Sequence, residues 1–124
     1  MKNKLKVTTA LLNEMKPLRT IYPKIKEKDL QKQILEYLNL KGHYCWRNNS
    51  GAFKTERGGF YRMGMIGSPD IIGVAKNGCF IGIEVKINGN KPSVYQDDFI
   101  KQIKSRGGIG IVAYSLDDVI NNGL

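Results

Sequence analysis

Three charged residues stand close together in a segment that otherwise has the composition of a buried β-hairpin. The segment is GSPDIIGVAKNGCFIGIEVK, residues 67–86, and the charges are Asp70, Glu84 and Lys86. Two neighbouring carboxylates repel each other, and each takes up a proton unless a cation lies between them. Oxygen ligands in this number favour Mg²⁺ or Mn²⁺ over zinc. Lys86 could orient an attacking water or screen developing negative charge. The pattern indicates metal-assisted hydrolysis of a phosphate ester.

The turn of this hairpin decides whether the two carboxylates meet. Strands are expected over residues 70–75 and 79–86. A two-residue Asn-Gly turn would place Asp70 and Glu84 on opposite faces. A three-residue turn with Gly78 left-handed places them side by side, on the face that also carries the lysine. We predict the three-residue turn, because only this register gathers the three charges without a further bulge. The other face of the second strand is expected to meet a helix (Ile81, Ile83 and Val85).

A first helix is predicted over residues 27–40, with Gly42 as its cap. At 100° per residue, Glu27 and Gln31 fall on its apolar face. A carboxylate on an inward face needs a partner, although Glu27 could also be a favourable charge at a helix N-terminus. The apolar face is formed by Leu30, Ile34, Tyr37 and Leu38.

A second helix is predicted over residues 93–106, followed by a buried strand over 109–114 and a short helix from Ser115 to about Asn121. Ser93 and Gln96 form a capping-box pattern, and Gln96 projects near the middle of the apolar face. That face consists of Tyr95, Phe99, Ile100 and Ile103. The element order predicts an α/β fold with a mixed β-sheet flanked by helices, its last strand parallel to the second hairpin strand.

Residues 48–65 are predicted to form a long polar loop in which basic and aromatic residues alternate. Such composition suits phosphate contact and base stacking, and an ordinary mobile loop is the alternative. The basic and aromatic residues are Lys54, Arg57, Arg62, Phe53, Phe60 and Tyr61. Just before them, Arg47, Asn48 and Asn49 are either turn formers or DNA contacts.

Positive charge is concentrated at the N-terminus. The 124 residues carry a formal net charge of +9, and residues 1–28 hold eight Lys or Arg against two Glu. Such an imbalance favours a polyanionic partner, nucleic acid first and an anionic membrane second. We therefore divide the chain into a basic N-terminal extension, residues 1–26, and one domain, residues 27–124.

The sequence also excludes several classes of protein. Cys45 and Cys79 are isolated and His43 is the single histidine, which argues against a zinc site. No apolar run reaches the length of a signal peptide or a membrane span. We expect a cytoplasmic protein with no membrane partner.

Five blocks in order, EKDLQ, WRNNSGA, GSPDIIG, IEVK and SVYQDDF, resemble the stand-alone VRR-Nuc domain of phages and bacteria. Pro69-Asp70 followed by Glu84-Val85-Lys86 looks like the PD-(D/E)xK nuclease motif of that superfamily. The resemblance covers roughly residues 27–119 and implies a restriction-endonuclease-like core. It also implies a Mg²⁺- or Mn²⁺-dependent endodeoxyribonuclease, with host cytoplasm as its location if it is phage-encoded.

The resemblance assigns roles to individual residues. It implies that Asp70, Glu84 and the Val85 carbonyl are metal ligands, with Lys86 as the catalytic lysine. Glu27 matches the family's glutamate in the first helix, which lies near the metal, and Gln31 matches the glutamine of the same helix. Gln96 matches the glutamine often found after the ExK strand, where it lies near the site. We expect DNA contacts from Arg47, Asn49, Lys54, Arg57 and Arg62.

The hypothesis from sequence is a nuclease selective for DNA shape, such as a four-way junction, because no base-reading helix is evident. Stand-alone members of the resembled family are associated with dimers, so a homodimer is expected, and two-fold symmetry would suit paired nicks in a junction. The alternatives are a non-catalytic DNA-binding module and an interaction subunit of a phage DNA-processing complex.

Overall fold

The computed structural model describes residues 25–49 and 51–124, without the side chains of residues 52, 53 and 62. Nearly all of the predicted N-terminal extension, residues 1–24, therefore lies outside the described residues. So do the side chains of Phe53 and Arg62.

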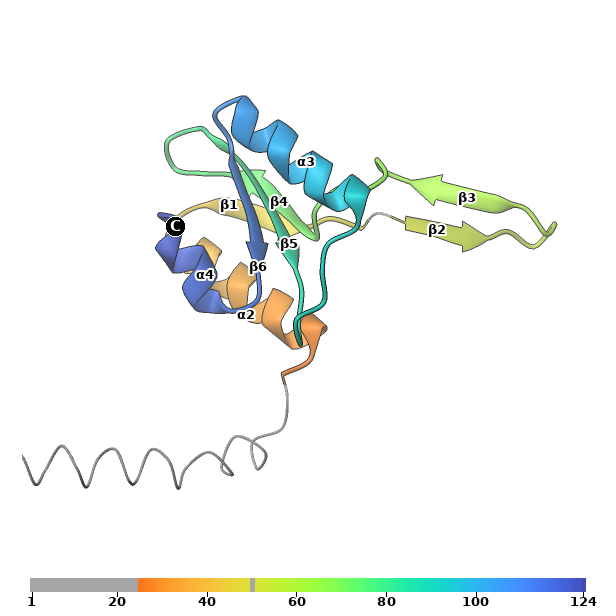
Figure 1. The fold of residues 1–124 in the computed structure, drawn as a ribbon, viewed down its shortest axis with the longest axis horizontal. Coiled ribbons are helices and arrows are strands. Elements are labelled where there is room, and N and C mark those ends of the chain that lie inside the picture. Colours follow the sequence, from red (N-terminus) through yellow and green to blue (C-terminus); the bar gives the residue numbers. More distant parts are fainter. Residues whose placement is uncertain (1–24, 50) are drawn as a thin grey trace, which may run out of the picture.

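A four-stranded sheet forms the centre of the fold (Figure 1). Its strand order is β1-β4-β5-β6. The pairs β1–β4 and β4–β5 are antiparallel, and β6 runs parallel to β5. The predicted mixed sheet and its parallel crossover are thus confirmed. The strands are β1 (Tyr44–Arg47), β4 (Ile71–Val74), β5 (Phe80–Val85) and β6 (Ile109–Ala113).

Helices α2 (Glu27–Leu40) and α4 (Leu116–Asn121) cover one face of this sheet, and α3 (Val94–Ser105) covers the other (Figure 1). The predicted helices of an α/β fold are confirmed. In the part of the chain that the structure describes, no helix is both long enough and apolar enough to cross a membrane.

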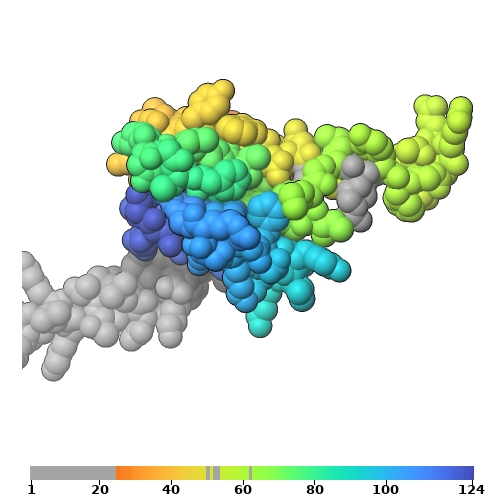
Figure 2. All heavy atoms as spheres, turned by 90° about the horizontal axis from the view of Figure 1, so that it is seen from above, coloured from red at the N-terminus to blue at the C-terminus, as the bar shows by residue number. Residues whose placement is uncertain are grey.

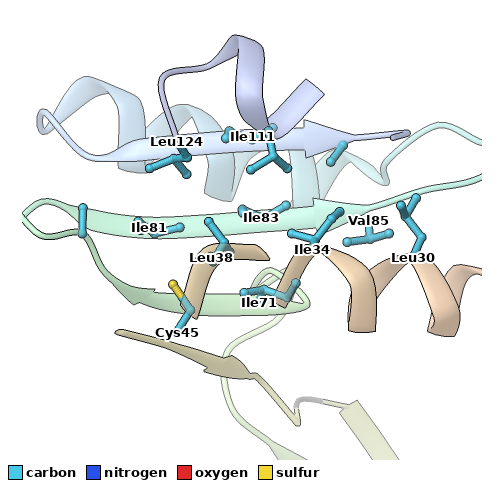
Figure 3. Close-up of a cluster of buried hydrophobic side chains, with 13 residues drawn as sticks. Leu30, Ile34, Leu38, Cys45, Ile71, Ile81, Ile83, Val85, Ile111 and Leu124 are labelled. Carbon is cyan, nitrogen blue, oxygen red and sulfur yellow. The ribbon is translucent and has the colours of Figure 1, made fainter. Parts of the chain in front are cut away.

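Leu30, Ile34 and Leu38 anchor α2 on the sheet because their spacing places them on one side of the helix. Figure 3 shows these three side chains lying along the strands of the sheet. Complete burial of such a side chain stabilises the fold by about 1.5–3 kcal/mol. This contact fixes the start of α2, and with it Glu27, relative to β5. The sheet side of the core includes Ile71, Ile81, Ile83, Val85 and Ile111.

Helix α3 lies close to the opposite face because glycine leaves room for it. A Cβ atom on Gly82 would come within 2.4 Å of the Ile103 side chain. Ile100 and Ile103 are buried as predicted, but Tyr95 is 65% exposed. The prediction of an inward Tyr95 is therefore wrong. Tyr95 belongs to the first turn of α3 and borders an open groove beside Met65, which leaves most of its surface exposed.

The β4–β5 hairpin has the predicted register. Ile71 pairs with Ile83 and Val74 with Phe80, so the next position outward sets Asp70 beside Glu84. Gly78 has a φ of 91°, a left-handed conformation that glycine adopts without strain. The three-residue turn is thereby confirmed.

The segment predicted as a long loop instead contains a second, two-stranded sheet. Strands β2 (Gly51–Lys54) and β3 (Phe60–Met63) pair antiparallel and form what we call the arm, residues 51–63. Its tip is closed by the Thr55 N–H, which donates to the Gly59 carbonyl at 2.8 Å. Figure 2 shows the arm projecting away from the body of the domain. The prediction missed these strands because a glycine-rich, charged segment does not alternate between apolar and polar residues.

Candidate active site

The site begins where β4 begins. Pro69 is buried and has no N–H to extend the ladder with β5, so regular pairing stops there. The Val85 N–H instead donates to Asp70 Oδ2 at 2.8 Å. In an antiparallel ladder the N–H and C=O of one residue point to the same neighbouring strand. The Val85 carbonyl therefore faces the side of β5 on which Asp70 lies.

Glu84 is the buried centre of the site, with only 2% of its surface exposed. Its Oε1 accepts a hydrogen bond from Gln96 Nε2 at 2.9 Å and lies 3.6 Å from Lys86 Nζ. Its Oε2 is buried and has no hydrogen-bond partner among the described residues. Burial, followed by the nearby charge of Asp70, raises the pKa of Glu84 to about 8, although the Lys86 ammonium acts in the opposite direction.

The unpartnered Oε2 of Glu84 allows a test of whether these residues fit a metal ion. A buried carboxylate oxygen without a partner is costly, and a second carboxylate beside it increases that cost. A hard divalent cation would satisfy both, and the donors here are oxygens of the kind that Mg²⁺ and Mn²⁺ prefer. The residues Asp70 and Glu84 therefore fit a metal ion.

The protein supplies a pair of carboxylates to this site. Within residues 25–49 and 51–124, no three His, Cys, Asp or Glu side chains form a group that could hold a metal. Glu27 is the first residue of α2 and is half-buried. The negative charge of Glu27 also raises the pKa of Glu84, and it is the smallest of the effects on that pKa. A role for Glu27 as a ligand stays a prediction.

Gln96 combines the two roles that its position in the sequence allows. Its Oε1 accepts from the Ser93 N–H at 2.8 Å, and its own N–H donates to Ser93 Oγ at 3.2 Å, which completes a capping box. Its Nε2 remains free to donate to Glu84. The start of α3 and the buried carboxylate are thus tied by one side chain.

Two residues around the site, Asn48 and Gln31, make contacts that the sequence did not predict. Asn48 Nδ2 donates to Ser68 Oγ at 2.9 Å and to the Pro69 carbonyl at 3.0 Å. The Asn48 N–H donates to the Asp70 carbonyl at 2.8 Å. Gln31 Oε1 accepts from the Arg47 guanidinium through two N–H groups, and a role for Gln31 at the site stays a prediction. Asn48 thus holds the segment leading into β4, a contact between distant segments that local sequence patterns do not reveal.

Solved structures resemble this chain in fold. One, described as "VRR_NUC domain", is 22% identical with a TM-score of 0.58, over 79% of this chain and 97% of that one. Another, described as "VRR_NUC domain protein", is 20% identical with a TM-score of 0.57, over 80% of this chain and 85% of that one. This chain has the VRR_NUC fold. No protein-family model and no curated protein matches it.

The residues expected to contact DNA divide into two groups on this VRR_NUC fold. Arg47 and Asn49 are exposed at the end of β1, where Arg47 pairs with Ile71 in the β1–β4 register. Lys54 and Arg57 are exposed on the arm, and Arg62 belongs to β3 of the arm. Phe60 and Tyr61 of the arm are 74% and 57% exposed.

Proposed function

We propose that this chain is a Mg²⁺- or Mn²⁺-dependent DNA endonuclease of the phage and bacterial stand-alone type, which hydrolyses phosphodiester bonds. The observation that carries the proposal is the buried, unpartnered Glu84 Oε2 beside Asp70, with Lys86 and Gln96 on the other oxygen. Such a pair of carboxylates has no evident structural use, because it costs stability unless a cation joins it. The VRR_NUC fold supports the same proposal, because the similar solved structures are described as VRR_NUC domains.

Asp70, Glu84 and the Val85 carbonyl would hold the metal ion, with Glu27 as a further ligand directly or through water. Bound there, the ion would supply positive charge that stabilises the phosphate oxygens as the bond breaks. Asp70 keeps its orientation because one carboxylate oxygen is fixed by the Val85 N–H. Gln96 holds Glu84 from the other side and so prepares the pair for a metal.

Lys86 is the residue we assign to the reacting phosphate. The Lys86 side chain is 17% exposed, and its Nζ lies 3.6 Å from Glu84 Oε1. An ammonium at this place can hold the attacking water or neutralise the charge that develops on the phosphate. The Lys86 backbone is fixed because its N–H donates to the Ala113 carbonyl of β6 at 3.0 Å.

The substrate we propose is branched DNA such as a four-way junction, bound by a homodimer. The exposed arm with Lys54 and Arg57 can reach a second duplex segment beyond the site. For the dimer we propose a groove of about 430 Å³ beside α3. Its walls include the exposed apolar side chains of Met65, Ile66 and Tyr95. A second copy would remove these side chains from water.

The test is cleavage of labelled four-way junction, flap, linear duplex and single-stranded DNA with Mg²⁺, Mn²⁺ or EDTA. Wild type is compared with Lys86→Ala and with a matched control, Lys104→Ala, at an exposed lysine of α3. We expect metal-dependent cutting that only Lys86→Ala abolishes, with DNA binding retained. Binding without cutting in every condition would favour a DNA-binding module. Analytical ultracentrifugation of wild type and of Ile66→Asp tests the dimer.

A further inference from the structure

A small basic hollow lies between α2 and the edge strand β1, next to the candidate active site. Its volume is about 230 Å³, and buried Ile71 forms part of its lining. Lys28 and Lys32 of α2 and Arg47 of β1 all border it and are all exposed. The hollow therefore gathers three cationic side chains on two elements that are distant in sequence.

Positive charges outnumber negative ones among the residues that line this hollow. Lys28 and Lys32 are four residues apart, so they are neighbours on the helix surface, where like charges are unfavourable. Asp29 is the one carboxylate that borders the hollow. Neither lysine is among the residues that form salt bridges in the described part of the chain. An anion in the hollow would relieve this repulsion.

Arg47 is oriented by Gln31. Gln31 Oε1 accepts from Arg47 Nε at 3.1 Å and from Nη2 at 2.6 Å. A guanidinium has five N–H groups, so three remain available for another acceptor. An arginine held in one orientation and presenting free N–H groups is well suited to a phosphate.

The position of the hollow relates it to the reaction. Arg47 pairs with Ile71 across the β1–β4 ladder, and Ile71 directly follows Asp70. Successive side chains of a strand point to opposite faces, so the hollow lies on the α2 face of the sheet and Asp70 on the opposite face, and the two places meet where β4 begins. A nucleic-acid strand that crosses this end of the sheet would provide phosphates at both places.

We propose that Lys28, Lys32 and Arg47 form a subsite for a DNA backbone phosphate next to the one that is cut, and that Gln31 is its positioning residue. This inference rests on the proposed nuclease function. It adds a phosphate-binding site formed by residues outside the set Asp70, Glu84 and Lys86. A phosphate in the subsite would fix which strand enters the site and in which direction.

The test measures DNA binding without cleavage. In a Lys86→Ala background with EDTA, duplex affinity is measured by fluorescence anisotropy across a series of salt concentrations. Each phosphate contact contributes about 0.9 to the slope of log affinity against log salt. We expect Lys28→Gln with Lys32→Gln to lower that slope by about 1. The matched control, Lys41→Gln with Lys104→Gln, removes the same charge from exposed lysines elsewhere and should leave the slope unchanged.

Equal losses in the two double variants would overturn the subsite, because they would show that overall charge alone matters. Binding to phosphatidylserine vesicles is measured for the same variants. If Lys28→Gln with Lys32→Gln weakens vesicle binding but leaves the DNA slope unchanged, the subsite is also overturned. Gln31→Glu should keep the fold and weaken DNA binding, since it places negative charge in the hollow. A protein that cuts no DNA yet shows the expected slopes would refute the nuclease while supporting the subsite.

Discussion

Gln96 reaches the buried Glu84 across the gap between α3 and β5, and its Nε2 donates to Glu84 Oε1 at 2.9 Å. The same side chain closes the cap of α3 through Ser93. The position of a helix and the orientation of a buried carboxylate therefore depend on one amide group.

This dual contact predicts different outcomes for two changes in the capping box. Gln96→Ala removes one half of the capping box and the contact to Glu84, so both stability and metal affinity should fall. Ser93→Ala removes only half of the cap and should cost about 1 kcal/mol with little change in metal affinity. Urea unfolding and Mn²⁺ titration calorimetry would measure the two effects. Equal metal affinity in both variants would show that Gln96 does not prepare the site.

The raised pKa of Glu84 predicts that the metal-free fold loses stability as the pH rises. The folded pKa is about 8 and the ordinary value is 4.5, so between these values the folded chain holds a proton that the unfolded chain releases. The stabilising contribution is complete below pH 4.5 and is lost as the pH approaches 8. Each pKa unit corresponds to about 1.4 kcal/mol, so the loss is on the order of a few kcal/mol.

Urea unfolding of wild type and Glu84→Gln at several pH values would check this loss. Glu84→Gln should flatten the pH dependence and raise stability at pH 8 in EDTA. Glu36→Gln, at an exposed position of α2, is the matched control and should follow wild type. A wild-type profile that stays flat between pH 5 and pH 8 would contradict the prediction.

The same carboxylate predicts that metal binding displaces a proton. Below pH 8 an incoming Mg²⁺ or Mn²⁺ must compete with the proton on Glu84, so affinity should rise about tenfold for each pH unit. Calorimetry in two buffers with different ionisation enthalpies should show release of close to one proton at pH 7. In Glu84→Gln that release should disappear. Binding with no linked proton in wild type would place the metal elsewhere.

Asn48 directly follows the edge strand β1, and its hydrogen bonds predict that replacing it affects the site. Asn48→Ala removes both side-chain hydrogen bonds to Ser68 and Pro69, which should cost about 1–3 kcal/mol. Metal affinity should fall as well, because the segment entering Asp70 loses its support. Asn49→Ala, at the exposed neighbouring position, should change neither property. Thermal unfolding and Mn²⁺ titration of the two variants would distinguish them.

Sequence patterns predicted those parts of the molecule that depend on local chemistry. The register that joins Asp70 to Glu84 follows from requiring the three charges to share one face, with Gly78 left-handed in the turn, and it is confirmed. The face of α2 followed from helical spacing, and the cap of α3 from Ser93 and Gln96. For the two helices the determining residues lie within a few positions of one another.

Contacts between distant segments were beyond those patterns. The pairing of Gln31 with Arg47 depends on the angle at which α2 crosses β1, which no local pattern encodes. Tyr95 has the right spacing for a buried residue, yet its turn of α3 borders an open groove. The arm was missed because its strands are short and the segment is rich in glycine and charge. These strands are defined by their pairing across the turn and not by residues that prefer the strand conformation.

The arm also bears on how such a domain can diverge. The described residues of the hydrophobic core include none from β2 or β3. Changes in the length or the tip of the arm therefore leave the packing of the central sheet untouched. An isolated two-stranded ribbon adds little stability of its own, so little is lost when it is replaced. Substrate preference could thus evolve by insertion and deletion within residues 51–63, while Asp70, Glu84 and Lys86 stay fixed on the body of the domain.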